Sequence, residues 1–431
     1  MSKEENRKNF SKYVSQNILG MIGFSCYVLA DSYFISIAKG ADGLTALNLV
    51  MPLYSIIFSI GEMIGVGSAI RYAISKIKKD ADADDYFWNA LIWCILSSMI
   101  FVFAGIFFSA DIMRVLGADE HIVAVGNNYT KIFMCFAPMF MCNYVTNAFV
   151  RNDGAPGIAM SATLFSSLFN IVFDYILMFP MNLGMEGAAL ATALSPIIGM
   201  GICSIHFFSK KSSVRLVVCK PSVRKLVAGC QLGISAFVGE MSSAVITLVF
   251  NFVILKLAGN VGVAAYGVVA NIAIVTTAVF NGVAQGSQPL ISSCFGRGDK
   301  DGCTQLKRMG YTTAFVLAAV MYSILFIFAG QFVAVFNSEG SEMLRLYATE
   351  GVKLYFIGIF FAGINIVGGG AFSATEDAFK AAVVSVARGF VLILGAVFVM
   401  SALFGMTGVW LAYAVAEGIT TFIMLVMVLR V

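Results

Sequence analysis

Long apolar runs separated by short polar stretches dominate the sequence of this 431-residue chain. We place twelve runs, and each is long enough to cross the hydrocarbon core of a membrane as a helix, which takes about 20 residues. Several are longer, so those helices should tilt or project beyond the bilayer. The pattern predicts an all-α polytopic membrane protein. The expected spans lie near residues 13–38, 44–75, 86–108, 121–149, 157–180, 187–208, 223–257, 261–294, 304–330, 343–373, 379–402 and 407–430.

The composition agrees with this pattern. Hydrophobic residues make up 59% of the chain and charged residues 12%, whereas a soluble domain has about 45–50% apolar and about 25% charged residues. The ten-residue alternation of a transmembrane barrel is missing from the sequence. The net charge of +4 is spread over the loops, which predicts no nucleic-acid partner. Nine cysteines without a C-x-x-C pair and two distant histidines, His121 and His206, predict no metal site built on those residue types.

Basic residues gather on one side of the predicted membrane. With the N-terminus inside, roughly 20 Lys and Arg residues fall on inner segments and roughly six on the outer side. This bias predicts that both termini are cytoplasmic and that the protein is a multi-pass component of the inner (plasma) membrane. The first apolar segment is too long and too polar for a cleaved signal peptide and shows no small-residue cleavage site, so we expect it to be retained.

A polar, basic stretch at residues 209–225 forms a predicted cytoplasmic linker between two six-span halves, an N-terminal lobe at 1–208 and a C-terminal lobe at 226–431. The halves resemble each other, with matched stretches about 220 residues apart. Because six is an even number, the halves should share one orientation and be related by a pseudo-two-fold axis along the membrane normal. That arrangement is typical of transporters, with the substrate path between the halves. The matches pair residues 65–68 (GVGS) with 284–287 (AQGS), and 184–187 (GMEG) with 405–408 (GMTG).

Four polar side chains fall inside predicted spans of the first half: Asp31, Asn170, Asp174 and Thr192. Asn170 and Asp174 stand four residues apart and therefore share one face of a helix. Asp31, Asp174 and Thr192 lie roughly 8–10 Å below the outer surface, with Asn170 one turn deeper. Such oxygen ligands suit a hard cation, and two close carboxylates can also hold a proton. The pattern predicts a cation site for H⁺ or Na⁺; the competing interpretation is a set of polar cross-links between helices.

The second half lacks this set, because Ala396 and Ala414 occupy the positions equivalent to Asp174 and Thr192. We expect its Arg388 and Glu417, which have similar depths, to form a structural ion pair rather than to bind substrate. Two further acids lie near the middle of their spans: Glu62 in span two and Glu240 in span seven. An unpaired acid facing the cleft between the halves would attract cationic substrates. A protonated acid packed against a helix is the equal alternative for both.

The order and spacing of several motifs resemble the MATE (multidrug and toxic compound extrusion) family over nearly the whole chain, most closely the bacterial MepA-like and DinF-like members. In that family, the resemblance implies, the residues matching Asp31, Asn170, Asp174 and Thr192 form the cation site of the first half. Glu240 is similar to an acid that some members use for coupling or substrate. Span ten has no mid-span acid here, which leaves a second-half cation site in doubt. The matching stretches are 28–32 (VLADS), 151–156 (RNDGAP), 170–177 (NIVFDYIL) and 187–192 (GAALAT).

The expected function is therefore secondary-active export of amphipathic, often cationic small molecules in exchange for H⁺ or Na⁺ by alternating access. We expect a monomer in the lipid bilayer that needs no cofactor besides the coupling ion. The alternative is a lipid-linked oligosaccharide flippase of the same architecture, which would need a basic cleft. An intramembrane enzyme is disfavoured, because the sequence has no H-E-x-x-H, Gly-Asp aspartyl-protease or Ser–His motif.

Overall fold

The computed structural model describes residues 3–336 and 341–429, and every regular element in that part of the chain is helical. The first half of the chain forms helices α1 to α6, and α7 begins the second half. They are α1 (Lys3–Lys78), α2 (Asp85–Val115), α3 (Glu120–Cys135), α4 (Ala137–Asn152), α5 (Pro156–Met178), α6 (Gly184–Phe207) and α7 (Val223–Gly296).

The remaining helices complete the second half. A 3-10 turn at Phe356–Gly358 and a π-helical turn at Ala387–Val391 connect consecutive helices without breaking their course. The helices are α8 (Lys300–Ile327), α9 (Ala329–Phe336), α10 (Glu342–Tyr355), α11 (Ile359–Ala374), α12 (Ala378–Val386) and α13 (Leu392–Leu429).

Three of these helices contain a sharp reversal at one glycine. Gly40 in α1, Gly259 in α7 and Gly405 in α13 have φ angles of 58°, 62° and 57°, while the residues on both sides are helical. Only glycine adopts this left-handed region without a steric penalty. Each of the three helices is therefore two antiparallel spans joined by a minimal turn. Gly40 and Gly259 stand at equivalent places in the two halves, which agrees with the predicted repeat.

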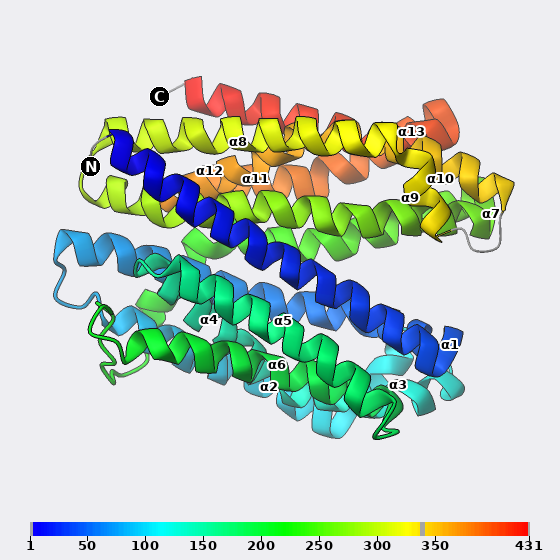
Figure 1. Cartoon of the computed structure of the whole chain (residues 1–431), viewed down its shortest axis with the longest axis horizontal. Helices are drawn as coiled ribbons and strands as arrows, with labels where there is room; N and C mark the ends of the chain where they lie inside the picture. The colour runs from blue at the N-terminus through cyan, green and yellow to red at the C-terminus, as the bar shows by residue number, and fades with distance from the viewer. Residues whose placement is uncertain (1–2, 337–340, 430–431) are drawn as a thin grey trace.

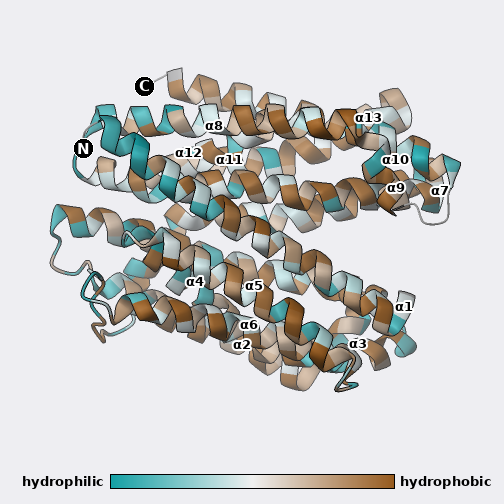
Figure 2. Cartoon of the chain, viewed as in Figure 1, coloured by the Kyte–Doolittle hydropathy of each residue, from teal (hydrophilic) through white to brown (hydrophobic). Residues whose placement is uncertain are grey.

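The span count agrees with the prediction. Among the described residues, nine helices are long and apolar enough to cross a membrane, and α3 with α4 forms one more span bent by 46°. Two of the nine, which contain Gly259 and Gly405, each comprise two spans. The total is twelve, and the predicted all-α polytopic fold is confirmed. Figure 2 shows the matching pattern along the ribbon, with apolar residues along the helices and hydrophilic ones more frequent near the helix ends.

Helix α1 extends beyond the predicted first span. The first span was expected to begin near residue 13, but α1 is helical from Lys3. The polar start of the chain is amphipathic rather than a loose tail, since Phe10 and Val14 are buried among apolar residues of the second half. Asn6 also donates a hydrogen bond to Gln305 at 3.2 Å. Packing against the other half stabilises helical turns that the local polar composition does not predict.

The two halves form separate bundles that share helices at one end. Figure 1 shows α1 crossing diagonally from the bundle of α8 and α11–α13 to the bundle of α2–α6, with both termini at the same end of the molecule. At that end the start of α1 packs on the second bundle, where a side chain at Gly282 would strike the backbone of Ile18. Conversely the start of α7 packs on the first bundle, where a side chain at Gly67 would strike the backbone of Gly229. This reciprocal exchange ties the bundles together near the termini.

Candidate cation site and inter-lobe pocket

Three of the four predicted cation ligands form one buried cluster between α5 and α6. Asn170 and Asp174 are fully buried, and Thr192 is 2% exposed. With the Asn170 amide nitrogen turned toward Asp174, it donates to Asp174 Oδ2 at 3.0 Å, and the amide oxygen accepts from the Thr192 hydroxyl at 3.1 Å and N–H at 3.2 Å. Asn170 is therefore held by Thr192 and presents its nitrogen to the carboxylate. The four-residue spacing on α5 produces this shared face.

Asp31 approaches this cluster from α1. It is 6% exposed, and its carboxylate lies within electrostatic reach of Asp174. The ring of Phe34, one turn along α1, lies 6.2 Å from the rings of both Tyr175 and Phe179, so the last turns of the first span of α1 pack beside the end of α5. The structure thus joins three of the four residues that the sequence singled out by hydrogen bonds, and it places the fourth, Asp31, on the adjacent helix α1.

The two carboxylates are incompletely satisfied. Oδ1 of Asp31 and Oδ1 of Asp174 are buried, and neither has a hydrogen-bond partner among the described residues. Neither carboxylate forms an ion pair with a described Lys or Arg. A buried charge without a partner is costly, so the arrangement favours a bound cation or a proton. In the described part of the chain no three His, Cys, Asp or Glu residues gather as a metal-binding group. A metal ion here would also need oxygen ligands from Thr192 or Asn170, and the Asn170 amide would have to turn its oxygen toward the carboxylates.

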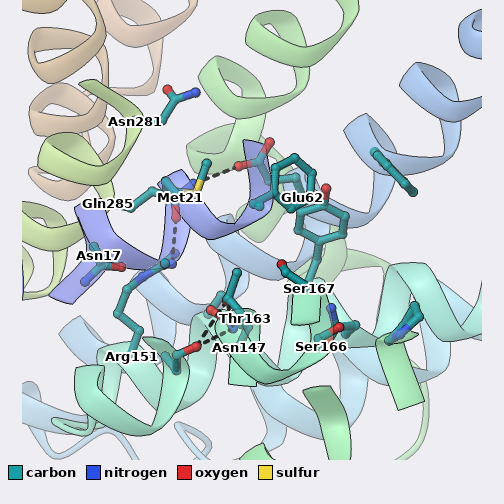
Figure 3. A pocket seen from close by; sticks show the side chains of 18 of the residues that line it. Asn17, Met21, Glu62, Asn147, Arg151, Thr163, Ser166, Ser167, Asn281 and Gln285 are labelled. Atoms are coloured by element: carbon teal, nitrogen blue, oxygen red, sulfur yellow. Dashed lines mark hydrogen bonds between the residues drawn. The ribbon is translucent and has the colours of Figure 1, made fainter. Parts of the chain in front are cut away.

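A pocket lies between the two bundles, on the face of α1 that is turned toward α4, α5 and α7. It is lined mainly by α1, α4 and α5 of the first bundle, and by Glu240, Asn281 and Gln285 of α7. Glu62, from the second span of α1, reaches the same pocket, as Figure 3 shows. The structure therefore brings Glu62 and Glu240, predicted from separate spans, to one pocket. Its aromatic lining consists of Phe24, Tyr27, Phe58, Phe140 and Tyr144.

In this pocket Gln285 of the second bundle bridges two charged side chains of the first bundle. Arg151 Nη1 donates to Gln285 Oε1 at 2.7 Å, and Gln285 Nε2 donates to Glu62 Oε1 at 3.2 Å. Arg151 lies just beyond the predicted span 121–149, yet it is only 4% exposed, because α4 continues to Asn152 and carries the arginine inside the bundle. The motif at residues 151–156 contains Arg151, but a sequence motif does not tell how deeply a side chain is buried in the bundle.

The second bundle holds a different polar cluster. Arg388 Nη2 lies 2.6 Å from Glu417 Oε1, and Arg388 Nε donates to both carboxylate oxygens. Asn365 of α11 donates to Glu417 Oε2 at 2.6 Å and accepts from the Thr421 hydroxyl at 3.0 Å. The structure thus joins Arg388 and Glu417 as an ion pair. Asn365, which the sequence analysis did not single out, completes the network.

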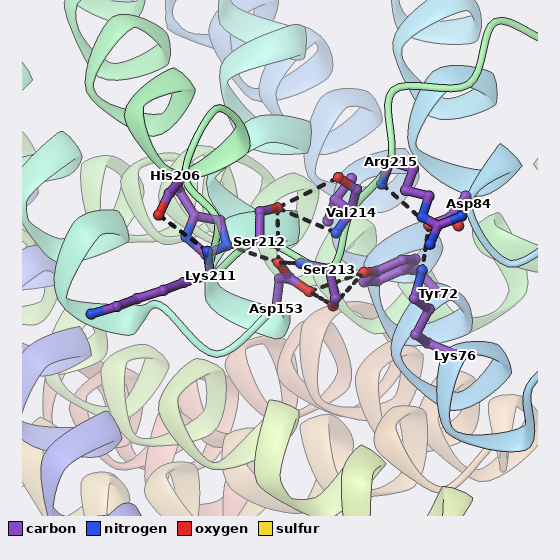
Figure 4. Close-up of polar contacts among 11 residues, drawn as sticks. Tyr72, Lys76, Asp84, Asp153, His206, Lys211, Ser212, Ser213, Val214 and Arg215 are labelled. Atoms are coloured by element: carbon purple, nitrogen blue, oxygen red, sulfur yellow. Dashed lines mark hydrogen bonds and ion pairs between the residues drawn. The ribbon is translucent and has the colours of Figure 1, made fainter.

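The linker between the halves is fixed to the first bundle through Asp153 (Figure 4). Asp153 accepts hydrogen bonds from the Tyr72 hydroxyl at 2.9 Å, from the Ser213 N–H at 2.9 Å and from the Ser213 hydroxyl, and His206 Nε2 lies 2.8 Å from it. Burial opposes ionisation of this carboxyl, but the hydrogen bonds from Ser213 and His206 outweigh it and lower its pKa. Helix α7 begins at Val223, where the seventh span was expected to start.

Comparison with known proteins places the chain in a family. The MatE family model matches residues 17–176 and 236–399, so the chain belongs to the MatE family and is a transporter rather than an enzyme. The resemblance found in the sequence is thereby confirmed.

Individual relatives agree with this assignment. The multidrug export protein MepA of Staphylococcus aureus (strain MRSA252) is 28% identical over 414 residues, which cover 93% of this chain and 89% of that protein. MepA of Staphylococcus saprophyticus is 26% identical over 405 residues, with the same two shares covered.

Solved structures match the fold. An outward-facing multidrug resistance MATE family transporter of the MOP superfamily superposes with a TM-score of 0.92 at 20% identity, covering 99% of this chain and 96% of that chain. A MOP superfamily transporter from Pyrococcus furiosus, described as having a binding pocket of reverse polarity that suggests a different function, gives 0.90 at 20% identity, covering 98% of this chain and 95% of that chain.

Proposed function

We propose that this transporter is a secondary-active multidrug efflux antiporter, which exports amphipathic, often cationic organic compounds in exchange for H⁺ or Na⁺. The observation that carries the proposal is the pair of buried carboxylates, Asp31 and Asp174, without a basic partner among the described residues. They share a bundle with most of the pocket lining, which contains the acids Glu62 and Glu240. The curated MepA relatives are named multidrug export proteins, which supports the same substrate class.

The cation site gives the transporter a way to couple two gradients. A cation bound at Asp31, Asn170, Asp174 and Thr192 neutralises charge that is otherwise buried at a cost. Neutralisation changes how α1 packs on α5, and α1 also lines the pocket through Asn17, Met21 and Phe24. Binding of the cation and of the substrate is therefore linked through one helix. Linkage requires each ligand to change the affinity for the other by the same factor.

Alternating access fits the position of the inter-bundle contacts. Asn6 meets Gln305, Arg71 pairs with Glu376, and Gly229 packs on the backbone of Ser68, all in the half of the molecule nearest the termini. If both termini are cytoplasmic, as the loop charges favour, these contacts would close the inner end, which supports an outward-facing conformation as one state of the cycle. Rocking of the two bundles, at 1–208 and 226–431 on either side of the linker, would open the inner end instead.

The charge of the pocket lining favours an efflux antiporter over the alternative function, a lipid-linked oligosaccharide flippase. A flippase for lipid-linked oligosaccharides, which carry phosphates, would need a basic cleft. The pocket lining here has two acids, Glu62 and Glu240, against one base, Arg151, and that arginine is hydrogen-bonded to Gln285. The balance favours organic cations over anionic lipids.

Efflux from proteoliposomes tests the proposal. The purified protein, inserted in vesicles, should drive out a cationic dye such as ethidium when a gradient of H⁺ or of Na⁺ is imposed separately, and the effective gradient identifies the coupling ion. Asp31→Asn, which keeps size but cannot exchange charge, is the matched control. Dye movement that ignores both gradients, or translocation of a lipid-linked pyrophosphate instead, would contradict antiport. We expect a monomer in the plasma membrane, which light scattering with the detergent contribution subtracted can check.

A further inference from the structure

The linker between the two bundles carries positive charge that the described residues do not neutralise. It comprises residues 208–222, between α6 and α7, and its sequence contains no Asp or Glu. Five basic residues in the linker or in the first turn of α7 are exposed, and none of them forms an ion pair with a described acid. They are Lys210, Lys211, Arg215, Lys220 and Arg224.

The acids that contact the linker are already paired. Asp84 Oδ1 accepts a hydrogen bond from Lys76 Nζ at 2.7 Å, and Asp85 Oδ2 accepts one from Lys225 Nζ at 2.6 Å. Asp153 is occupied by the contacts that Figure 4 shows. A counter-charge for the exposed basic side chains therefore has to come from another molecule.

The linker is held in place through its main chain. The Ser213 N–H donates to Asp153 Oδ2 at 2.9 Å, and the Ser222 N–H donates to Asn89 Oδ1 at 2.7 Å. Between these two anchors, residues 215–218 are all exposed. Because backbone donors fix the segment, its side chains are left to face the surroundings. The linker therefore presents an ordered surface.

Apolar side chains accompany the charges on this surface. Leu216 and Val218 are 52% and 76% exposed, and Phe208, which directly follows α6, is 82% exposed. Val223, the first residue of α7, is exposed as well. Helices α6 and α7 are long and apolar enough to cross a membrane, so exposed apolar residues such as Ile205 near the end of α6 face lipid. The apolar part of the linker continues that lipid-facing surface. Figure 1 shows the linker at the end of the molecule where both termini lie.

We propose that the linker binds the headgroups of anionic phospholipids in the membrane leaflet at this end of the molecule, with Leu216 and Val218 inserted at the boundary between headgroups and acyl chains. Basic residues are attracted to an anionic leaflet, and apolar residues gain by leaving water. The inference goes beyond export and depends on neither the coupling ion nor the substrate. Because the linker is fixed to the first bundle through Asp153, lipid binding attaches that bundle to the membrane surface.

Two other environments for the linker explain less. A linker surrounded by water accounts for neither Leu216 nor Val218, since exposed apolar side chains gain nothing there. An acidic soluble protein would match the basic residues. However, Phe208 and Val223 lie at the ends of spans that lipid already surrounds, and a soluble partner would have to displace that lipid.

A spin label at Val218 tests the proposal. Val218→Cys is made in the full-length protein without its nine native cysteines, labelled, and reconstituted in phosphatidylcholine nanodiscs with or without phosphatidylglycerol. Power-saturation EPR compares collisions of the label with oxygen, which dissolves in the bilayer, and with the nickel complex NiEDDA, which stays in water. With phosphatidylglycerol the label should be accessible to oxygen and protected from NiEDDA, and without it the protection should be lost. Ala81→Cys, in the exposed acidic turn between α1 and α2, is the matched control and should meet NiEDDA in both lipids.

Charge variants in the Val218→Cys background complete the test. Arg215→Gln combined with Lys220→Gln should reduce the lipid-associated population by up to about thirtyfold, since each basic residue near an anionic surface contributes about a factor of five. Arg215→Lys combined with Lys220→Arg keeps both charges and should preserve the protection. A label that meets NiEDDA equally in both lipids would overturn the proposal and favour a soluble acidic partner. Protection without phosphatidylglycerol, or after loss of both charges, would overturn recognition of anionic headgroups. Each of these results leaves the proposed export function untouched, because EPR accessibility is measured without transport.

Discussion

The two bundles handle buried acids in opposite ways. In the second bundle Glu417 has a permanent cation, because Arg388 lies 2.6 Å away, and Asn365 satisfies the remaining oxygen. In the first bundle Asp31 and Asp174 have no such partner, and one oxygen of each is unsatisfied among the described residues. An arginine side chain neutralises a buried carboxylate permanently. A buried carboxylate without such a partner is stabilised only when it binds a proton or a cation that can also leave. The difference supports the proposed cation site in the first bundle and a static ion pair in the second.

The repeat sharpens this contrast. Arg388 and Glu417 stand about 220 residues after Ser166 and Ser195, and the Ser166 hydroxyl donates to the Ser195 carbonyl at 2.7 Å. The same pair of helix positions thus carries a neutral hydrogen bond in the first bundle and an ion pair in the second. The same architecture therefore accommodates either kind of contact, and the side chains alone decide which one forms.

The largest effect is expected at the exchange site. Asp31→Asn and Asp174→Asn should each reduce ion-driven dye export to the background of protein-free vesicles, because an amide cannot take up or release a charge. The double variant should add little, since the site fails as a unit. Export rates under an imposed ion gradient, with expression and monodispersity checked, provide the measurement. Wild-type rates in both single variants would reduce the cluster to a helix cross-link.

The second largest effect concerns folding. Glu417→Gln leaves the Arg388 guanidinium buried without a counter-charge, which should cost about 3–5 kcal/mol of stability. Replacing both residues by Met should cost much less, since no charge remains buried. Thermal unfolding in detergent, followed by tryptophan fluorescence, compares the variants. Equal destabilisation by the single and the double change would mean that packing, and not charge, dominates at this place.

A smaller effect is expected from the other partner of the same pair. Arg388→Gln leaves Glu417 alone, but a carboxyl can neutralise itself by binding a proton, whereas an arginine in a protein cannot lose one. We therefore expect Arg388→Gln to destabilise less than Glu417→Gln, and to be more stable in acidic than in alkaline buffer. Unfolding temperatures across a pH series, with the wild-type protein as reference, check both points. The reverse ranking of the two variants would contradict the charge argument.

The smallest effect lies between the bundles. Glu240→Gln should weaken efflux of cationic dyes by a few-fold relative to neutral ones, because it removes one of the two acids in the pocket lining. Initial efflux rates for a cationic and a neutral dye of similar size give the ratio. A uniform loss for both dyes would assign Glu240 to structure or coupling instead of substrate attraction.

Much of this arrangement follows from periodicity and depth. The apolar runs predict the twelve spans, and the four-residue spacing of Asn170 and Asp174 predicts their shared face. Depth alone also predicts that Arg388 can reach Glu417. Contacts between bundles are different, because they depend on how far a helix extends and on which side it turns. Arg151 reads as an inner charge until α4 is seen to continue past it, and Gln285 reads as a repeat marker until it meets both Arg151 and Glu62.

The glycine reversals determine where this protein can be engineered. At Gly40, Gly259 and Gly405 the chain turns within one residue, and helix continues on both sides. A reporter peptide inserted there has no loop to accommodate it, so it would push apart two packed spans. The connections at residues 116–119 and 179–183, at the same end of the molecule, lie outside the helices and offer backbone that can absorb an insertion. Surface tags for this transporter therefore belong in those two connections.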